Sequence, residues 1–214
     1  MAKVYLAQDD LDGVARALRA GVLACLPTET VYGIGVSVAA FDDYAEVPGP
    51  ETGYGRIFTL KRRDLSQTVP WLVADEEALL RYGAKVPRVT MRLAERFWPG
   101  ALTLVVDAAD DVPSFLKAAD GTIALRASAS PVIQKLVGAC SSPLAVTSAN
   151  THGAPAPISF DRVESRILEG VDVAVDAGET PCRDASTIVA IRSGAPVILR
   201  EGALSRADIA SVFE

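Results

Sequence analysis

The sequence predicts a single α/β domain whose twisted sheet, mixed or parallel, is flanked by helices. Short apolar runs alternate with amphipathic segments for most of the chain, as strands alternate with helices in this class. No internal repeat interrupts the alternation, which favours one domain. The 214 residues, 50% of them hydrophobic, supply a sizeable core and exclude a disordered chain.

Bulk charge and cysteine usage narrow the class of protein further. A formal net charge of -6 argues against a protein that coats nucleic acid, but it does not exclude a local basic groove. The 3 cysteines lie far apart and form no Cys-x-x-Cys pair, which favours a reducing compartment without a disulfide framework. The sequence shows neither a signal peptide nor an apolar run of membrane-spanning length. We therefore expect a soluble cytoplasmic protein.

The N-terminal elements are predicted from apolar spacing and capping residues. Residues 4–6 form a short strand, and a helix begins at Asp9 or Asp10 and continues through Arg19. The apolar run 22–26 is predicted to be a buried strand.

A polar segment follows this strand and is the most informative part of the chain. Pro27 has no N–H for ladder pairing, and Gly33 and Gly35 tolerate unusual backbone angles, so a strand that ends in a shaped turn is predicted. The hydroxyls of Thr28 and Thr30, together with free N–H groups, suit an anionic ligand. An ordinary strand-to-helix connection remains an equally open interpretation.

Residues 37–55 are rich in proline and glycine towards their end and are expected to lack regular structure. A loop of this length is typically a functional lid or a disordered insertion. The cations Lys61, Arg62 and Arg63 come soon afterwards, and they are either ligand-binding groups or a solvated charge run.

The rest of the chain continues the alternation. Asp75 caps one helix, and the Trp98-Pro99-Gly100 sequence ends another. Helices are predicted over 76–82, 88–97, 131–138 and 160–168, and strands over 69–74, 101–106, 122–126, 144–147, 171–175, 187–191 and 197–199.

Small polar and cationic side chains recur at the ends of the predicted strands. Ligands bind outside strand ends in open α/β sheets, so these groups are expected to converge on one crevice. Hydroxyls, amides and cations without a strong general base suit phosphates and carboxylates, with catalysis by positioning and charge neutralisation as in nucleotidyl transfer. The set comprises Thr28, Thr30, Lys61, Arg63, Arg126, Ser148, Asn150, Ser186, Thr187 and Arg200.

Other chemistries find little support. The 1 histidine, His152, lies on a Gly/Pro-rich turn and is expected to be an exposed loop residue rather than part of a Ser-His-Asp triad. No serine occupies a Gly-x-Ser-x-Gly elbow, and no His/Cys cluster predicts a zinc site.

In their order along the chain, several motifs resemble the YrdC-like family of L-threonylcarbamoyladenylate synthases. Each motif alone is weakly specific, whereas the ordered series spans nearly the whole chain, from about residue 10 to 204. The motifs are Pro27-Thr28-Glu29-Thr30-Val31-Tyr32-Gly33, Lys61-Arg62-Arg63, Trp98-Pro99-Gly100-Ala101-Leu102-Thr103, Ala124-Leu125-Arg126, Thr147-Ser148-Ala149-Asn150, Ser186-Thr187-Ile188 and Leu199-Arg200-Glu201-Gly202.

The resemblance implies one YrdC-like domain over 1–214, with a lid insertion at 37–55. It implies that threonine, bicarbonate and ATP are joined into threonylcarbamoyl-AMP with release of pyrophosphate and help from Mg²⁺. A partner transferase would then modify tRNA, which the chain itself would contact only weakly.

The resemblance also assigns roles to residues of this sequence. Lys61 and Arg63 are expected to be catalytic and to contact the phosphates and the carboxylated substrate. Threonine or its carbamate is expected at Thr28, Thr30 and Arg126. The nucleotide is expected at Thr147, Ser148, Asn150, Ser186 and Arg200.

The sequence departs from the family pattern around the expected amino-acid site. Asp64 replaces a proline, Ser128 and Ser130 stand at the usual proline and histidine positions, Ala74 replaces a histidine of some members, and His152 replaces a serine. Two alternatives to the threonine enzyme therefore stay open. One is a divergent paralogue with another amine acceptor, and the other is a non-catalytic RNA-binding module.

Overall fold

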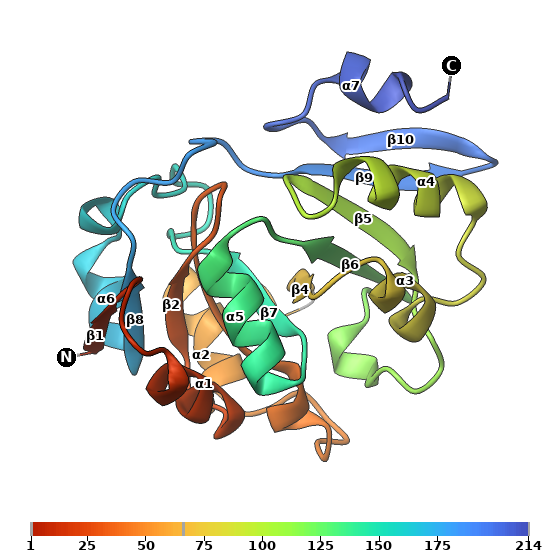
Figure 1. Ribbon diagram of the computed structural model, residues 1–214. Coiled ribbons are helices and arrows are strands. Elements are labelled where there is room, and N and C mark those ends of the chain that lie inside the picture. Colours follow the sequence, from red (N-terminus) through yellow and green to blue (C-terminus); the bar gives the residue numbers. More distant parts are fainter. Residues whose placement is uncertain (1, 66, 214) are drawn as a thin grey trace.

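One continuous mixed sheet forms the centre of the molecule and twists strongly between its two edges (Figure 1). The computed structural model describes residues 2–65 and 67–213. In these residues the strand order is β1-β8-β2-β3-β7-β4-β6-β5-β9-β10. The strands are β1 (Lys3–Leu6), β2 (Ala24–Pro27), β3 (Tyr32–Ser37), β4 (Trp71–Val73), β5 (Leu102–Asp107), β6 (Thr122–Ala127), β7 (Leu144–Ser148), β8 (Val173–Asp176), β9 (Thr187–Arg192) and β10 (Ala195–Arg200).

Both kinds of strand pairing occur in this sheet. β8 pairs in parallel with β1 and β2, and the β4–β6 and β5–β9 pairs are also parallel. The remaining neighbours, such as β2–β3, β3–β7 and β5–β6, are antiparallel. The predicted α/β class with a mixed sheet is therefore confirmed.

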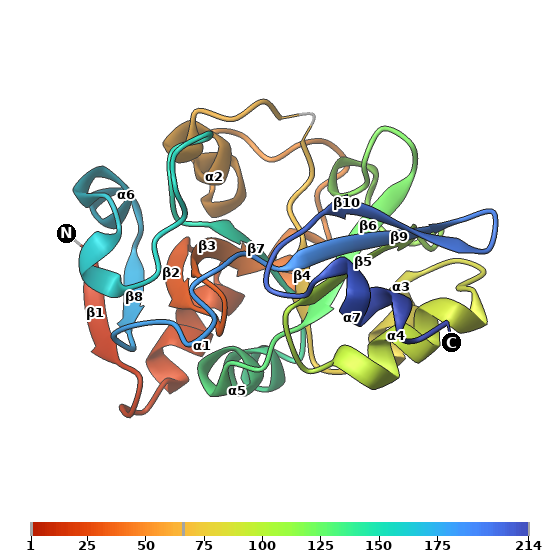
Figure 2. The same ribbon diagram turned by 90° about the horizontal axis from the view of Figure 1, so that it is seen from above.

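Helices cover both faces of the sheet (Figure 2). Helices α1 (Asp12–Arg19) and α5 (Pro131–Cys140) pack on one face, and α2 (Gly53–Lys61) and α6 (Ser165–Gly170) pack on the other. Three further helices flank the β5–β9–β10 half of the sheet (Figure 1). They are α3 (Glu77–Tyr82), α4 (Arg88–Phe97) and α7 (Arg206–Ala210). No helix within 2–65 and 67–213 is long and apolar enough to cross a lipid bilayer.

Two glycines bring the central strands β3 and β7 close together. A Cβ atom on Gly35 would lie 2.3 Å from the carbonyl oxygen of Ala145, and one on Gly33 would lie 2.5 Å from a methyl carbon of Val146. Neither site has room for a side chain. This close packing sets Thr147 and Ser148, at the end of β7, beside the turn that joins β2 to β3.

Several predicted elements differ from the structure. Strand β3 was not predicted, because its two glycines weaken a strand pattern, and helices α2 and α7 were also missed. The helix predicted over 160–168 is only partly right: a short 3₁₀ turn, Phe160–Arg162, comes first, and the α-helix α6 begins separately at Ser165.

The expectation that 37–55 lacks regular structure is only partly right. A 3₁₀ turn, Val38–Phe41, opens the segment, and α2 begins at Gly53 with the Thr52 side chain as its N-terminal cap. Between them the backbone forms no helix or strand. That this segment acts as a lid stays a prediction.

The glycine packing predicts a large difference between two Gly→Ala variants. We expect Gly35→Ala to lower the free energy of unfolding by about 1–3 kcal/mol, because its methyl group collides with a backbone oxygen. Gly138→Ala is the matched control: Gly138 is exposed in α5 with no neighbouring atom within 4 Å, so we expect a gain of about 0.5–1 kcal/mol. Urea unfolding measures both values, and equal effects would contradict the packing described here.

Candidate functional site

The predicted polar residues converge on a cavity of about 290 Å³ beside the open ends of β2, β7 and β6. A larger groove of about 910 Å³ adjoins it and shares Pro70, Thr147, Ile188 and Arg200 with it. Arg63 lines the groove. The cavity itself is lined by eight of the predicted residues: Thr28, Thr30, Arg126, Thr147, Ser148, Asn150, Ser186 and Arg200.

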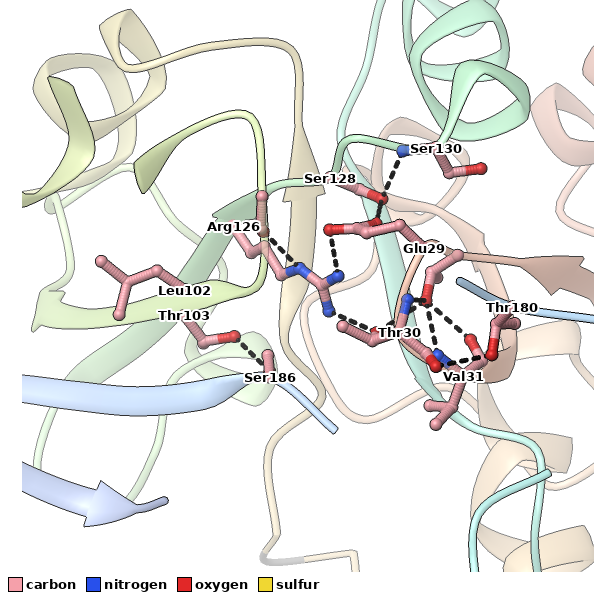
Figure 3. Close-up of polar contacts among 12 residues, drawn as sticks. Glu29, Thr30, Val31, Leu102, Thr103, Arg126, Ser128, Ser130, Thr180 and Ser186 are labelled. Atoms are coloured by element: carbon pink, nitrogen blue, oxygen red, sulfur yellow. Dashed lines mark hydrogen bonds and ion pairs between the residues drawn. The ribbon is translucent and has the colours of Figure 1, made fainter. Parts of the chain in front are cut away.

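Thr28 organises the turn between β2 and β3. Its hydroxyl donates to the carbonyl oxygen of Val31 at 2.6 Å and accepts from the N–H groups of Thr30 and Val31, both at 3.1 Å. The hydroxyls of Thr28 and Thr30 lie 2.8 Å apart, and Thr180 donates to the Thr30 carbonyl at 2.8 Å. Thr30 is thus fixed with its hydroxyl towards Arg126 (Figure 3).

Arg126 reaches this turn from the end of β6 and is nearly fully buried. Its Nη1 donates to the Thr30 hydroxyl at 3.0 Å, its Nη2 to Oε1 of Glu29 at 2.5 Å, and its Nε to the carbonyl oxygen of Gly100 at 3.0 Å. Each nitrogen of the guanidinium therefore has a protein partner, while the group still lines the cavity.

The sequence analysis did not assign Glu29 to the site. Its side chain is 8% exposed and accepts from Arg126 on Oε1 and from the Ser128 hydroxyl on Oε2. Burial raises the pKa of Glu29, but the Arg126 charge and the Ser128 hydrogen bond outweigh it, so the pKa lies below its ordinary value. The one available signal was its place between two site threonines.

Lys61 lines neither the cavity nor the groove but bonds to residues that border the cavity. It is 3% exposed, and its ammonium donates to the carbonyl oxygens of Ser148 and Asn150 and to Oδ1 of Asn150 at 3.3 Å. Burial, reinforced by the charge of Arg63, lowers the pKa of Lys61 to about 8. Lys61 therefore holds the turn after β7 in place and adds a positive field to it.

Arg63 points into the groove because α2 ends just before it. Arg62 adopts a left-handed conformation with φ of 51°, which turns the chain away from the helix axis. The Arg63 guanidinium then donates to the Thr147 hydroxyl at 3.2 Å and to Oε1 of Gln67 at 2.9 Å. Burial lowers the pKa of Arg63.

Arg200, at the end of β10, closes the other side of the cavity. Its Nη2 donates to the carbonyl oxygen of Ser186 at 2.7 Å and to the Ser186 hydroxyl at 3.1 Å. That hydroxyl lies 2.8 Å from the hydroxyl of Thr103, a further contact that the sequence did not indicate (Figure 3). Burial and then the positive charge of Arg126 lower the pKa of Arg200.

Two expectations about single residues are settled by the structure. His152 is exposed, as expected, and only its backbone N–H, bonded to the Lys61 carbonyl oxygen, serves the site. Thr187 was wrongly grouped with the cavity residues: its hydroxyl donates to the Leu204 carbonyl oxygen and accepts from the N–H groups of Gly202 and Leu204. It stabilises the connection to α7 instead.

The electrostatics of the site favour an anion. The charge of Arg63 adds to burial in lowering the pKa of Lys61, and the charge of Arg126 adds to burial in lowering the pKa of Arg200. Such repulsion is relieved when phosphate or carboxylate oxygens bind between the cations. Within the described residues, no group of three or more His, Cys, Asp or Glu side chains could hold a metal ion.

Sequence comparison identifies proteins that this chain resembles. The Sua5/YciO/YrdC family model, described as "Telomere recombination", matches residues 16–202. The threonylcarbamoyl-AMP synthase of Pyrococcus abyssi is 34% identical over 196 residues, which cover 92% of this chain and 55% of that protein. The putative threonylcarbamoyl-AMP synthase of Mycobacterium tuberculosis is 35% identical over 197 residues, or 92% of this chain and 86% of that protein. The chain thus spans about half the length of the archaeal relative.

Solved structures show the same fold. The crystal structure of P. abyssi Sua5 complexed with L-threonine has a TM-score of 0.87 and 30% identity, and the match covers 99% of this chain and 60% of that one. E. coli YciO, at 20% identity, shares the fold with a TM-score of 0.83 over 98% of this chain and 100% of its own. The chain belongs to the Sua5/YciO/YrdC family.

Proposed function

We propose that this chain, acting as one YrdC-like domain over 1–214, is an L-threonylcarbamoyladenylate synthase. It forms threonylcarbamoyl-AMP from threonine, bicarbonate and ATP and releases pyrophosphate. The observation that carries the proposal is that two arginines, Arg126 and Arg200, line one cavity together with several hydroxyl groups. The names of the relatives support the same activity.

We assign the amino-acid half of the reaction to the side of the cavity that is lined by Thr28 and Arg126. There the threonine amine attacks the carbon derived from bicarbonate, water leaves, and a carbamate forms. Arg126 and the hydroxyls of Thr28 and Thr30 bind the substrate carboxylate or the carbamate. A carbamate oxygen then attacks the α-phosphorus of ATP, and pyrophosphate departs in line.

The nucleotide half belongs to the adjoining groove. Arg63, Arg200 and the Ser186 hydroxyl bind the phosphates together with the turn that carries Thr147, Ser148 and Asn150. Lys61 contributes its positive field through that turn. The donor set of the site is cationic, so Mg²⁺ would be held mainly by phosphate oxygens and water, where it neutralises charge.

The two alternative functions have less support. Ser128 and Ser130 do not line the cavity; they bond to Glu29 and to the Pro27 carbonyl oxygen, and Ala74 is exposed beyond the end of β4. These departures therefore leave threonine as the preferred amine acceptor over another amine. The net charge of -6 disfavours an RNA-binding module, although weak tRNA contact and a partner transferase in the cytoplasm remain part of the proposal.

Removal of the Arg63 guanidinium is expected to abolish turnover. In Arg63→Ala, kcat/KM for threonine-dependent pyrophosphate release should fall at least about 100-fold, because a cation that stabilises the transferring phosphates is lost. The neighbouring exposed Arg62 is the control: Arg62→Asn removes the same charge, and asparagine tolerates its left-handed backbone. Similar losses in both variants, with native circular dichroism, would contradict the assignment.

The affinity for ATP is expected to depend on the charge of Lys61. Its pKa of about 8 lies below its ordinary value, and bound phosphates raise it again, so binding takes up a proton above about pH 8. The ATP dissociation constant should therefore stay level below about pH 8 and rise up to tenfold per pH unit above it. Calorimetry in buffers of different ionisation enthalpy measures the proton uptake directly. Lys61→Met should bind more weakly and without this uptake; an identical uptake in both proteins would contradict the prediction.

A further inference from the structure

The buried carboxylate of Glu29 takes no part in the mechanism above, yet it holds the group that binds the substrate. We propose that Glu29 is a positioning residue that orients Arg126, and that Ser128 in turn orients Glu29. The inference rests on the proposed role of Arg126 in binding the carboxylate or carbamate of the amino acid.

The donor inventory of Arg126 gives the first argument. A guanidinium carries five N–H groups. Three are taken by Glu29, Thr30 and Gly100, one on each nitrogen. One N–H therefore remains on Nη1 and one on Nη2, and both are available to oxygen atoms of the substrate. Figure 3 shows Arg126 held between Glu29 and Thr30, so the direction of the remaining pair is set before substrate binds.

The second argument is the way in which Glu29 itself is held. Oε2 accepts from the Ser128 hydroxyl, which accepts from the Ser130 N–H at 3.2 Å. The Ser130 hydroxyl donates to the Pro27 carbonyl oxygen at 2.9 Å. The two serines thus join the β6–α5 turn to the β2–β3 turn. Both carboxylate oxygens are engaged, and the lowered pKa keeps Glu29 charged, so it orients Arg126 rather than shuttling a proton.

Charge supplies the third argument. Arg126 and Glu29 are 7% and 8% exposed, and a buried guanidinium without a counter-charge is strongly unfavourable. Arg126 and Arg200 both line the cavity, and the charge of Arg126 is the second cause, after burial, that lowers the pKa of Arg200. Without the Glu29 charge, Arg126 would turn towards bound phosphates and away from the amino acid. Glu29 therefore keeps Arg126 directed at the amino acid, while Arg200 binds the nucleotide.

Steady-state kinetics of Glu29→Gln tests this role, since the amide keeps the shape and loses the charge. We expect KM for threonine to rise about tenfold or more while KM for ATP changes less than about twofold. Ser128→Ala should raise KM for threonine by a smaller factor. Ser128→Thr keeps the hydroxyl and should leave this KM at the wild-type value. Glu179→Gln, at an exposed glutamate paired with Arg183, is the matched control and should change neither KM.

A second readout needs no turnover. The Nε–H signal of Arg126 in a proton–nitrogen NMR spectrum, assigned by its loss in Arg126→Lys, should exchange slowly with solvent in the wild type. It should exchange at least about tenfold faster in Glu29→Gln and in Ser128→Ala. If the wild type does not turn over threonine, the proposed function fails, and this signal still decides whether Glu29 holds Arg126. Unchanged exchange would overturn the inference, as would equal rises in both KM values.

Discussion

The buried ion pair between Glu29 and Arg126 is the contact on which the site depends. It joins the β2–β3 turn to the end of β6, although β3, β7 and β4 lie between β2 and β6 in the sheet. β4 is only three residues long, and Pro70 and Leu72 line the cavity there. The ion pair thus links two strand ends that no hydrogen bond of the sheet joins directly.

The site concentrates positive charge that the free protein stabilises poorly. Lys61 is buried, Arg63 is half-buried and Arg200 stays exposed at the rim, and loss of hydration is the first cause that lowers the pKa of each one. Carbonyl and hydroxyl oxygens, such as those of Ser148, Asn150 and Ser186, solvate these cations in place of water. Part of the stability of the fold is thus given up for a preorganised anion site, as is common in enzymes.

Much of the fold and site follows from local pattern, and the misses have physical causes. Apolar runs located nine of the strands, whereas β3 and α2 depend on glycines such as Gly35 and Gly53 that fit against neighbouring backbone only in the folded chain. Thr187 was misassigned because its hydroxyl is taken by the backbone of Gly202 and Leu204, a contact that no local pattern indicates. Glu29 was missed because no local pattern shows that Arg126, far along the chain, would pair with it.

Carbon-13 labelling tests the proposed activity most directly. The purified chain would be incubated with ATP, Mg²⁺, threonine and carbon-13 bicarbonate, and the products would be analysed by mass spectrometry. We expect threonylcarbamoyl-AMP with one labelled carbon and an equal amount of pyrophosphate. ATP binding without any threonine-dependent labelled adenylate would contradict the proposed activity and would return the amine acceptor to an open question.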